Sequence, residues 1–167
     1  MTIKTATPKQ QWLNTLGQER AITLKVLRAF PTQQGDFQPH PRSQSARRLM
    51  WAFVTELEVI DAAIRGTLKM PPELPPEPAT IADVISAYER RSSQVERVVA
   101  GAPESRLHST VQFFTGPGQI ADVPILQIMW LMLMDSVHHR GQLSVYLRMA
   151  GGKVPSIYGP SADEPWT

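Results

Sequence analysis

Apolar residues recur at helical spacing in four long segments of the chain. Their intervals of about three or four residues predict helices over residues 8–30, 43–69, 80–100 and 124–150. The stripes that carry this prediction are Trp12, Leu13, Leu16, Ile22, Val26 and Phe30, then Ala46, Leu49, Phe53, Leu57, Ile60 and Ile64, then Ile81, Val84, Ile85, Tyr88, Val95 and Val98. Pro31 prevents the first helix from continuing, and Ser43 or Ser45 and Thr80 are suitable N-caps for the second and third.

The predicted helix 124–150 differs from the others because its first three turns are almost entirely apolar, as "VPILQIMWLMLM" shows. A helix that is apolar on all sides has to be covered on all sides. We therefore expect it at the centre of the molecule or in a dimer interface. Gly151 and Gly152 follow it, where a left-handed cap costs little.

Proline and glycine interrupt the chain between these helices. The segments "PTQQGDFQPHPRSQ" and "MPPELPPEPAT" read as irregular connectors, and "RLHSTVQFFTGPGQIADVP" as a loop with one short extended piece. The tail "KVPSIYGPSADEPWT" should cross the bundle, with Ile157, Tyr158 and Trp166 as anchors. The prediction is one all-α domain over residues 1–167, a four-helix bundle with long connectors and an irregular C-terminal tail.

Composition narrows the possible functions. The chain has no cysteine, which leaves any metal to nitrogen and oxygen ligands, and its formal net charge is only +2. Its basic residues are scattered, so we expect no nucleic-acid partner. The N-terminus lacks a signal-peptide pattern and no apolar run is long enough to span a bilayer, so we expect no membrane association and a cytoplasmic location.

One pair of polar residues stands out on the fourth helix. Asp135 and His139 are four residues apart, so their side chains project from the same face, and Gln142 and Tyr146 continue that stripe. Two ligands at this spacing can grip one metal ion, because one helical turn rises by only about 5.4 Å. A local hydrogen-bonded pair is the alternative. His138 points about 100° away and is not expected to bind the same ion.

The string "DSVHHRGQLSVYLRMAGGKVPSIYGPSADEP", with "SARRLMWAFVTELEVIDAAIRG" on the second helix, resembles the DinB/YfiT-like family over nearly the whole chain. The resemblance implies a four-helix bundle with an uncommon helix connection, a homodimer, and a divalent metal, nickel or zinc. It also implies three histidine ligands, one on the second helix and two spaced H-x3-H on the fourth.

This chain departs from that ligand pattern. His139 matches the histidine before Arg-Gly, Asp135 replaces the other, and Ala52 occupies the second-helix position with no ligating atom. The site is therefore predicted to be degenerate, holding the metal weakly or not at all. Glu56, one turn beyond Ala52, is a possible substitute ligand, or else it forms a salt bridge with Arg140 or Arg148.

Three functions follow as hypotheses. The resemblance implies a metal-dependent transferase using a low-molecular-weight thiol, or a hydrolase, with Arg140, Gln142 and Tyr146 as substrate-pocket candidates. A second hypothesis is a binding protein that has lost its metal and holds a small molecule in a cavity lined by methionines such as Met129, Met132 and Met134. The third is a homodimer without a ligand, in which His139 or an arginine pairs with Asp135. The sequence leaves open whether the protein is an enzyme.

Overall fold

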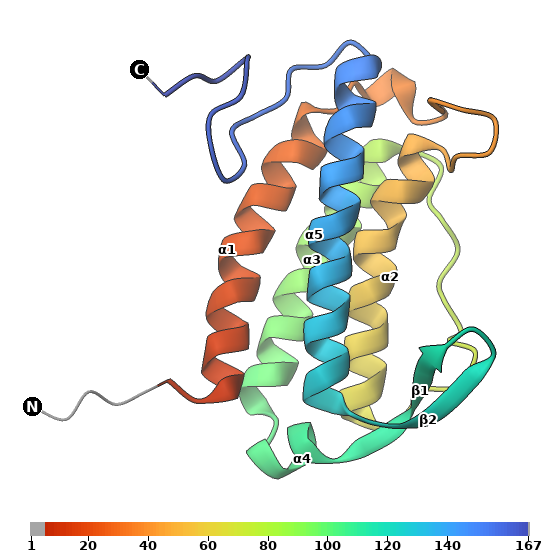
Figure 1. Cartoon of the computed structure of the whole chain (residues 1–167), viewed down its shortest axis with the longest axis vertical. Helices are drawn as coiled ribbons and strands as arrows, with labels where there is room; N and C mark the ends of the chain where they lie inside the picture. The colour runs from red at the N-terminus through yellow and green to blue at the C-terminus, as the bar shows by residue number, and fades with distance from the viewer. Residues whose placement is uncertain (1–5, 167) are drawn as a thin grey trace, which may run out of the picture.

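The computed structural model describes residues 6–166, so Met1 to Thr5 and Thr167 of the expected 1–167 domain lie outside the described residues. Four long helices run side by side, and a hairpin lies at one end of the bundle while the C-terminal tail lies at the other (Figure 1). The elements are α1 (Pro8–Ala29), a 3-10 turn η1 (Thr32–Gln34), α2 (Ala46–Arg65), α3 (Ile81–Gly101), α4 (Glu104–His108), β1 (Thr110–Gly116), β2 (Gln119–Pro124) and α5 (Ile125–Met149).

The ends of the helices follow from the residues that cap them. Ser45 accepts a hydrogen bond from the backbone of Arg48 at the start of α2, and Thr80 accepts one from Asp83 at the start of α3. Gly66, with φ of 76°, ends α2 in the left-handed conformation. Because of this glycine, α2 ends earlier than the predicted residue 69. The other long helices lie within one residue of their predicted limits.

Each long helix packs against two others. α2 packs against α3 and α5, and α1 also packs against α3 and α5, so the consecutive helices α1 and α2 lie across the diagonal of the bundle. The buried core contains most residues of the apolar stripes named above, whereas Leu13, Ile22, Ile85 and Val98 are only partly buried. Trp12 donates its indole N–H to the carbonyl of Met129 over 3.0 Å. None of the helices in the described part of the chain is long and apolar enough to cross a membrane.

The all-α expectation is correct only roughly, because β1 and β2 form an antiparallel two-stranded sheet. β1 is rich in β-branched and aromatic residues, and Gly118, with φ of 69°, makes the turn. Phe113 and Val123 turn one face of the hairpin toward α2 and α5, where they pack with Val59 and Ile128. The predicted loop with one extended piece is therefore a short helix and a hairpin.

The helix α5 is not covered on all sides within one chain. Its buried face includes Ile128, Leu133 and Leu143, but four apolar side chains are about half exposed or more. These are Leu131, Met134, Val145 and Met149, at 49%, 63%, 58% and 55% exposure. They lie near the three- and four-residue spacing of one helix face.

Candidate metal centre

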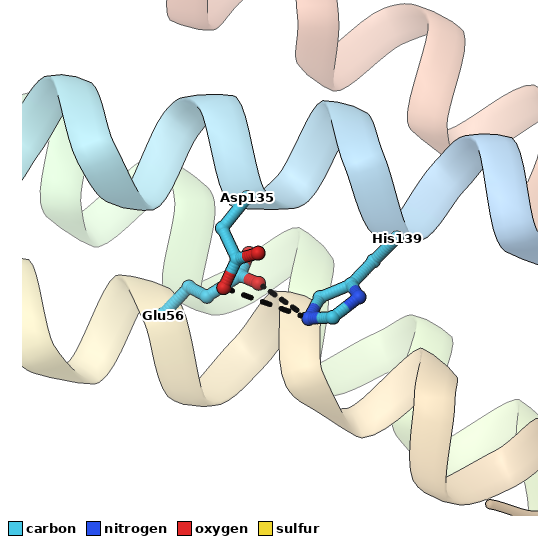
Figure 2. A group of neighbouring side chains, drawn as sticks. All are labelled: Glu56, Asp135 and His139. Carbon is cyan, nitrogen blue, oxygen red and sulfur yellow. Dashed lines mark ion pairs between the residues drawn. The ribbon is translucent and has the colours of Figure 1, made fainter. Parts of the chain in front are cut away.

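Three side chains from two helices meet in the seam between α2 and α5. Glu56 comes from α2, and Asp135 and His139 come from α5, one turn apart (Figure 2). The Nε2 atom of His139 lies 3.5 Å from Oε1 of Glu56 and 3.6 Å from Oδ2 of Asp135. One ligand atom from each residue lies within 4.8 Å of the others. The structure thus brings together the two candidates from the fourth helix and the substitute from the second.

Glu56 is buried with half of its carboxylate unsatisfied. Its residue is 6% exposed, its Oε2 accepts a hydrogen bond from the hydroxyl of Ser136, and its Oε1 has no hydrogen-bond partner among the described residues. The pKa of Glu56 is raised to about 9: burial is the main cause, the Ser136 hydrogen bond opposes the shift, and the charge of Asp135 adds to it. In the absence of a cation, this carboxyl group therefore holds a proton at neutral pH.

His139 is oriented by its other ring nitrogen. Nδ1 lies 3.1 Å from the amide oxygen Oε1 of Gln142. An amide oxygen only accepts, so this contact favours the tautomer with the hydrogen on Nδ1, in which Nε2 can bind a metal ion. The ring also meets the edge of Phe53 at 6.5 Å between centroids. A residue that hydrogen-bonds the second ring nitrogen of a metal-binding histidine commonly fixes the tautomer and the direction of the ring, and Gln142 is placed to do this for His139.

The donor set fits a divalent ion. Two carboxyl oxygens and one imidazole nitrogen converge, and these three groups need a shared proton or a cation between them. Ligand atoms about 2.1 Å from a tetrahedral ion are separated by about 3.4 Å, which matches the measured separations of 3.5 and 3.6 Å. The Asp135 side chain is 44% exposed, so the centre is open to solvent on that side.

Ala52 lies one turn before Glu56 on the same face of α2 and is partly exposed. Its methyl group supplies no ligand, as the sequence indicated, and Glu56 reaches α5 from the next turn. The alternative in which Glu56 forms a salt bridge with an arginine is wrong. Arg140 pairs with Glu19 at 2.6 Å, and Arg148 pairs with Asp163.

Arg140 does not lie in an accessible pocket, in contrast to the expectation that it would contact substrate. It is 1% exposed, and its guanidinium donates to Thr23 at 3.1 Å and to Tyr158 of the C-terminal tail. The Tyr158 ring also stacks on it, 5.0 Å from the guanidinium carbon. Tyr158 is thus an anchor of the tail, as predicted, while Trp166 donates to Ser156 within the tail itself.

The interior of the bundle leaves little room for a ligand. The cavity that borders Glu56 and Ser136 has a volume of about 10 Å³, less than a small organic molecule needs. The three methionines do not line a shared cavity either, since Met129 is fully buried in the core, Met132 borders this gap and Met134 is 63% exposed. An interior small-molecule pocket therefore finds no support here.

Sequence reasoning missed Ser136 and the bond between Gln142 and His139. The bond between Gln142 and His139 could have been predicted from the sequence, because residues three apart on a helix are neighbours. Ser136 had none beyond being a polar residue in an apolar helix. Gln142 and Tyr146 lie on the surface beside the centre, where the hydroxyl of Tyr146 donates to the carbonyl of Gln44 over 3.3 Å.

A four-helix bundle with a carboxylate and histidine cluster between two core helices defines a class of helical proteins that could hold a divalent metal. The chain belongs to the DinB family, whose sequence model matches residues 1–166. It is 25% identical over 147 residues to the uncharacterized protein YrdA of Bacillus subtilis strain 168, a match that covers 87% of this chain and 85% of YrdA.

Solved structures share the fold. A DinB-like protein from Bacillus cereus ATCC 10987 superposes with a TM-score of 0.73 at 21% identity, covering 88% of this chain and 95% of that one. YfiT from Bacillus subtilis superposes with a TM-score of 0.67 at 11% identity, covering 92% of this chain and 94% of YfiT. YfiT is described as a probable metal-dependent hydrolase with an unusual four-helix bundle topology.

Proposed function

We propose that this protein is a metal-dependent hydrolase of small molecules, with Glu56, Asp135 and His139 as ligands of a zinc or nickel ion. The observation that carries the proposal is the buried, unpartnered Oε1 of Glu56, which lies 3.5 Å from Nε2 of His139. A structural ion pair between His139 and Asp135 accounts for those two residues, but it leaves the Glu56 oxygen without a partner. Burying such an atom is costly unless something binds it.

A bound divalent ion supplies Lewis acidity, which lowers the pKa of water and polarises a carbonyl group. The residues of this chain position it: Ser136 holds one oxygen of Glu56, and Gln142 holds the ring of His139. The half-exposed carboxylate of Asp135 has a second oxygen that can accept a proton. In the reaction, the oxygen of water bonds to the acyl carbon, the bond to the leaving group breaks, and one water proton passes through Asp135 to the leaving group.

The ligand set favours one kind of nucleophile over the other. Two carboxylates and one imidazole form a harder ligand set than three histidines, and oxygen ligands suit ions that bind water. We therefore favour water over a low-molecular-weight thiol as the nucleophile. The description of YfiT as a probable metal-dependent hydrolase supports this choice by analogy of fold.

The test begins with the metal. Chelator-stripped protein is titrated with zinc, nickel and manganese by calorimetry, beside Glu56→Gln and His139→Gln. Loss of a direct ligand should weaken binding by at least about 100-fold, the upper end of what an outer-shell loss costs. Glu73→Gln is the matched control, since that carboxylate is 76% exposed and pairs with the exposed Lys69. Equal binding by wild type and Glu56→Gln would refute this ligand set.

Activity is then measured with 4-nitrophenyl hexanoate on metal-loaded and metal-free protein. Metal-dependent release of 4-nitrophenol is expected, and Asp135→Asn should abolish it. The thiol alternative is tested in parallel by consumption of glutathione in the presence of monobromobimane. Acceleration of that reaction without ester hydrolysis would favour the transferase over the hydrolase.

We also propose that the protein is a cytoplasmic homodimer that pairs through the exposed stripe of α5. The stripe consists of Leu131, Met134, Val145 and Met149, and exposed apolar side chains gathered on one helix face commonly mark an interface. Analytical ultracentrifugation should give the mass of a dimer for wild type and of a monomer for Met134→Glu. A wild-type monomer at micromolar concentration would contradict the pairing.

A further inference from the structure

Two hollows open on the surface beside the candidate metal centre, and they share Gln44 in their walls. The smaller has a volume of about 120 Å³ and includes Arg48 and Ala52 from α2. The larger has a volume of about 360 Å³ and includes Arg42 from the connector and Gln142 from α5. They adjoin each other at Gln44, and we call the two together the Gln44 hollow.

The Gln44 hollow touches both helices that carry the ligands. On α2, Ala52 lies one turn before Glu56. On α5, Gln142 is the residue whose amide oxygen faces Nδ1 of His139 at 3.1 Å. A side chain larger than that of Ala52 would project into the hollow on the α2 side. The alanine therefore leaves space beside the centre as well as removing a ligand.

The charged groups in the wall of the Gln44 hollow are cations. Arg42 and Arg48 line it, and neither part of its wall includes a carboxylate. Arg48 is 57% exposed and its nearest acid, Glu77, is 3.8 Å away, whereas Glu77 is bound at 2.7 Å by Arg47. Arg42 forms no ion pair within residues 6–166.

Another arginine-rich surface differs from the Gln44 hollow in its neighbouring acidic residues. The groove between α1 and α3 is lined by Arg20, Arg28, Arg90 and Arg97. There, however, Arg28 pairs with Glu89 and Arg20 with Glu96 at 3.5 Å. Acids thus offset part of the charge of that groove, and no metal ligand adjoins it. The Gln44 hollow differs from that groove because no carboxylate lines its wall and because it adjoins the candidate centre.

We propose that the Gln44 hollow binds the anionic group of the substrate, a carboxylate or a phosphate, through Arg42 and Arg48. The role of this binding in catalysis rests on the proposed function. Under that function, the substrates are small esters or amides that also carry a carboxylate or a phosphate group. Arg48 and Glu56 are eight residues apart on α2, which places their backbones about 12 Å apart. The anionic group should therefore be separated from the scissile bond by several single bonds.

Steady-state kinetics with two esters that differ in one charged group test whether the Gln44 hollow binds an anionic group. Mono(4-nitrophenyl) adipate carries a free carboxylate, and 4-nitrophenyl hexanoate has the same chain length without it. For the metal-loaded protein, kcat/KM should be about tenfold higher for the anionic ester, as expected for a charge-assisted contact. The double variant Arg42→Gln, Arg48→Gln should lose this preference. Arg97→Gln, in the α1–α3 groove, is the control.

Binding to metal-free protein tests the hollow independently of activity. Adipate and inorganic phosphate are titrated separately while NMR follows the side-chain N–H signals of arginine and the backbone of Gln44. Shifts at Arg42, Arg48 and Gln44 support the proposal, and the anion that causes them identifies a carboxylate or phosphate source. Such shifts without any ester hydrolysis would refute the hydrolase and leave the anion site standing. Absent shifts, or equal shifts at Arg97, would overturn the anion site even if both esters are hydrolysed.

Discussion

Replacing Glu56 by glutamine should remove a pH dependence of stability that the buried carboxyl group imposes on the metal-free protein. Burial raises the pKa of Glu56 from 4.5 to about 9. The folded protein therefore keeps this proton up to about pH 9, while the unfolded chain releases it above about pH 4.5. The stability from the retained proton is fully present below the unfolded pKa and is lost as pH rises toward the folded one.

The size of the effect follows from the number of pH units in that window. Within that window, each rise of one pH unit lowers the free energy of unfolding by about 1.4 kcal/mol. Between pH 6 and pH 8, metal-free wild type should lose on the order of 3 kcal/mol from this group. Glutamine keeps the size and an acceptor for Ser136 but does not titrate, so Glu56→Gln should lose much less over the same range.

Urea denaturation of chelator-treated protein at pH 6, 7 and 8 measures both slopes. Glu73→Gln, at an exposed acid, controls for the loss of one negative charge and should retain the wild-type slope. Parallel slopes for wild type and Glu56→Gln would mean that the carboxyl group ionises freely in the folded protein. The argument for an unsatisfied buried oxygen at the centre would then fail.

Three further variants probe the surroundings of the centre. Ala52→His adds an imidazole one turn before Glu56 and should lower the Kd for zinc by about tenfold or more in calorimetry; unchanged affinity would show that position 52 does not face the ion. Gln142→Leu removes the acceptor beside His139 Nδ1 and should weaken zinc binding by about 10- to 100-fold at an unchanged melting temperature. Arg140→Met leaves the carboxylate of Glu19 without its cation and should lower the free energy of unfolding by about 3 kcal/mol in urea; a loss below about 1 kcal/mol would show that the pair is not buried in solution.

The helices were predictable from the sequence because each long helix carries a sustained apolar stripe and a recognisable end. Ser45, Thr80 and Gly66 act through local hydrogen bonds or backbone conformation, which do not depend on the rest of the fold. The hairpin was harder to predict. Its strands pair only with each other and bury few side chains, so their pattern is short, and the Gly-Pro-Gly sequence at the turn is equally typical of a loop.

The centre was predictable in part for the same reason. Asp135 and His139 lie on one helix, so their spacing places them together whatever the rest of the chain does. Whether Glu56 joins them depends on how α2 and α5 are rotated against each other, and no local pattern determines that rotation. The sequence therefore leaves two possibilities for Glu56, and only the packing of the helices decides between them.

The rotation of α5 connects the centre with the buried arginine beside it. Adjacent residues on a helix point about 100° apart, so when His139 faces α2, Arg140 faces α1, where it meets Glu19 and Thr23. A buried guanidinium that satisfies a carboxylate, a hydroxyl and Tyr158 tolerates little rotation, because any turn of the helix would break contacts that water cannot replace. Arg140 is therefore a positioning residue. It does not touch the ligand atoms, yet by fixing the rotation of α5 it directs Asp135 and His139 toward Glu56.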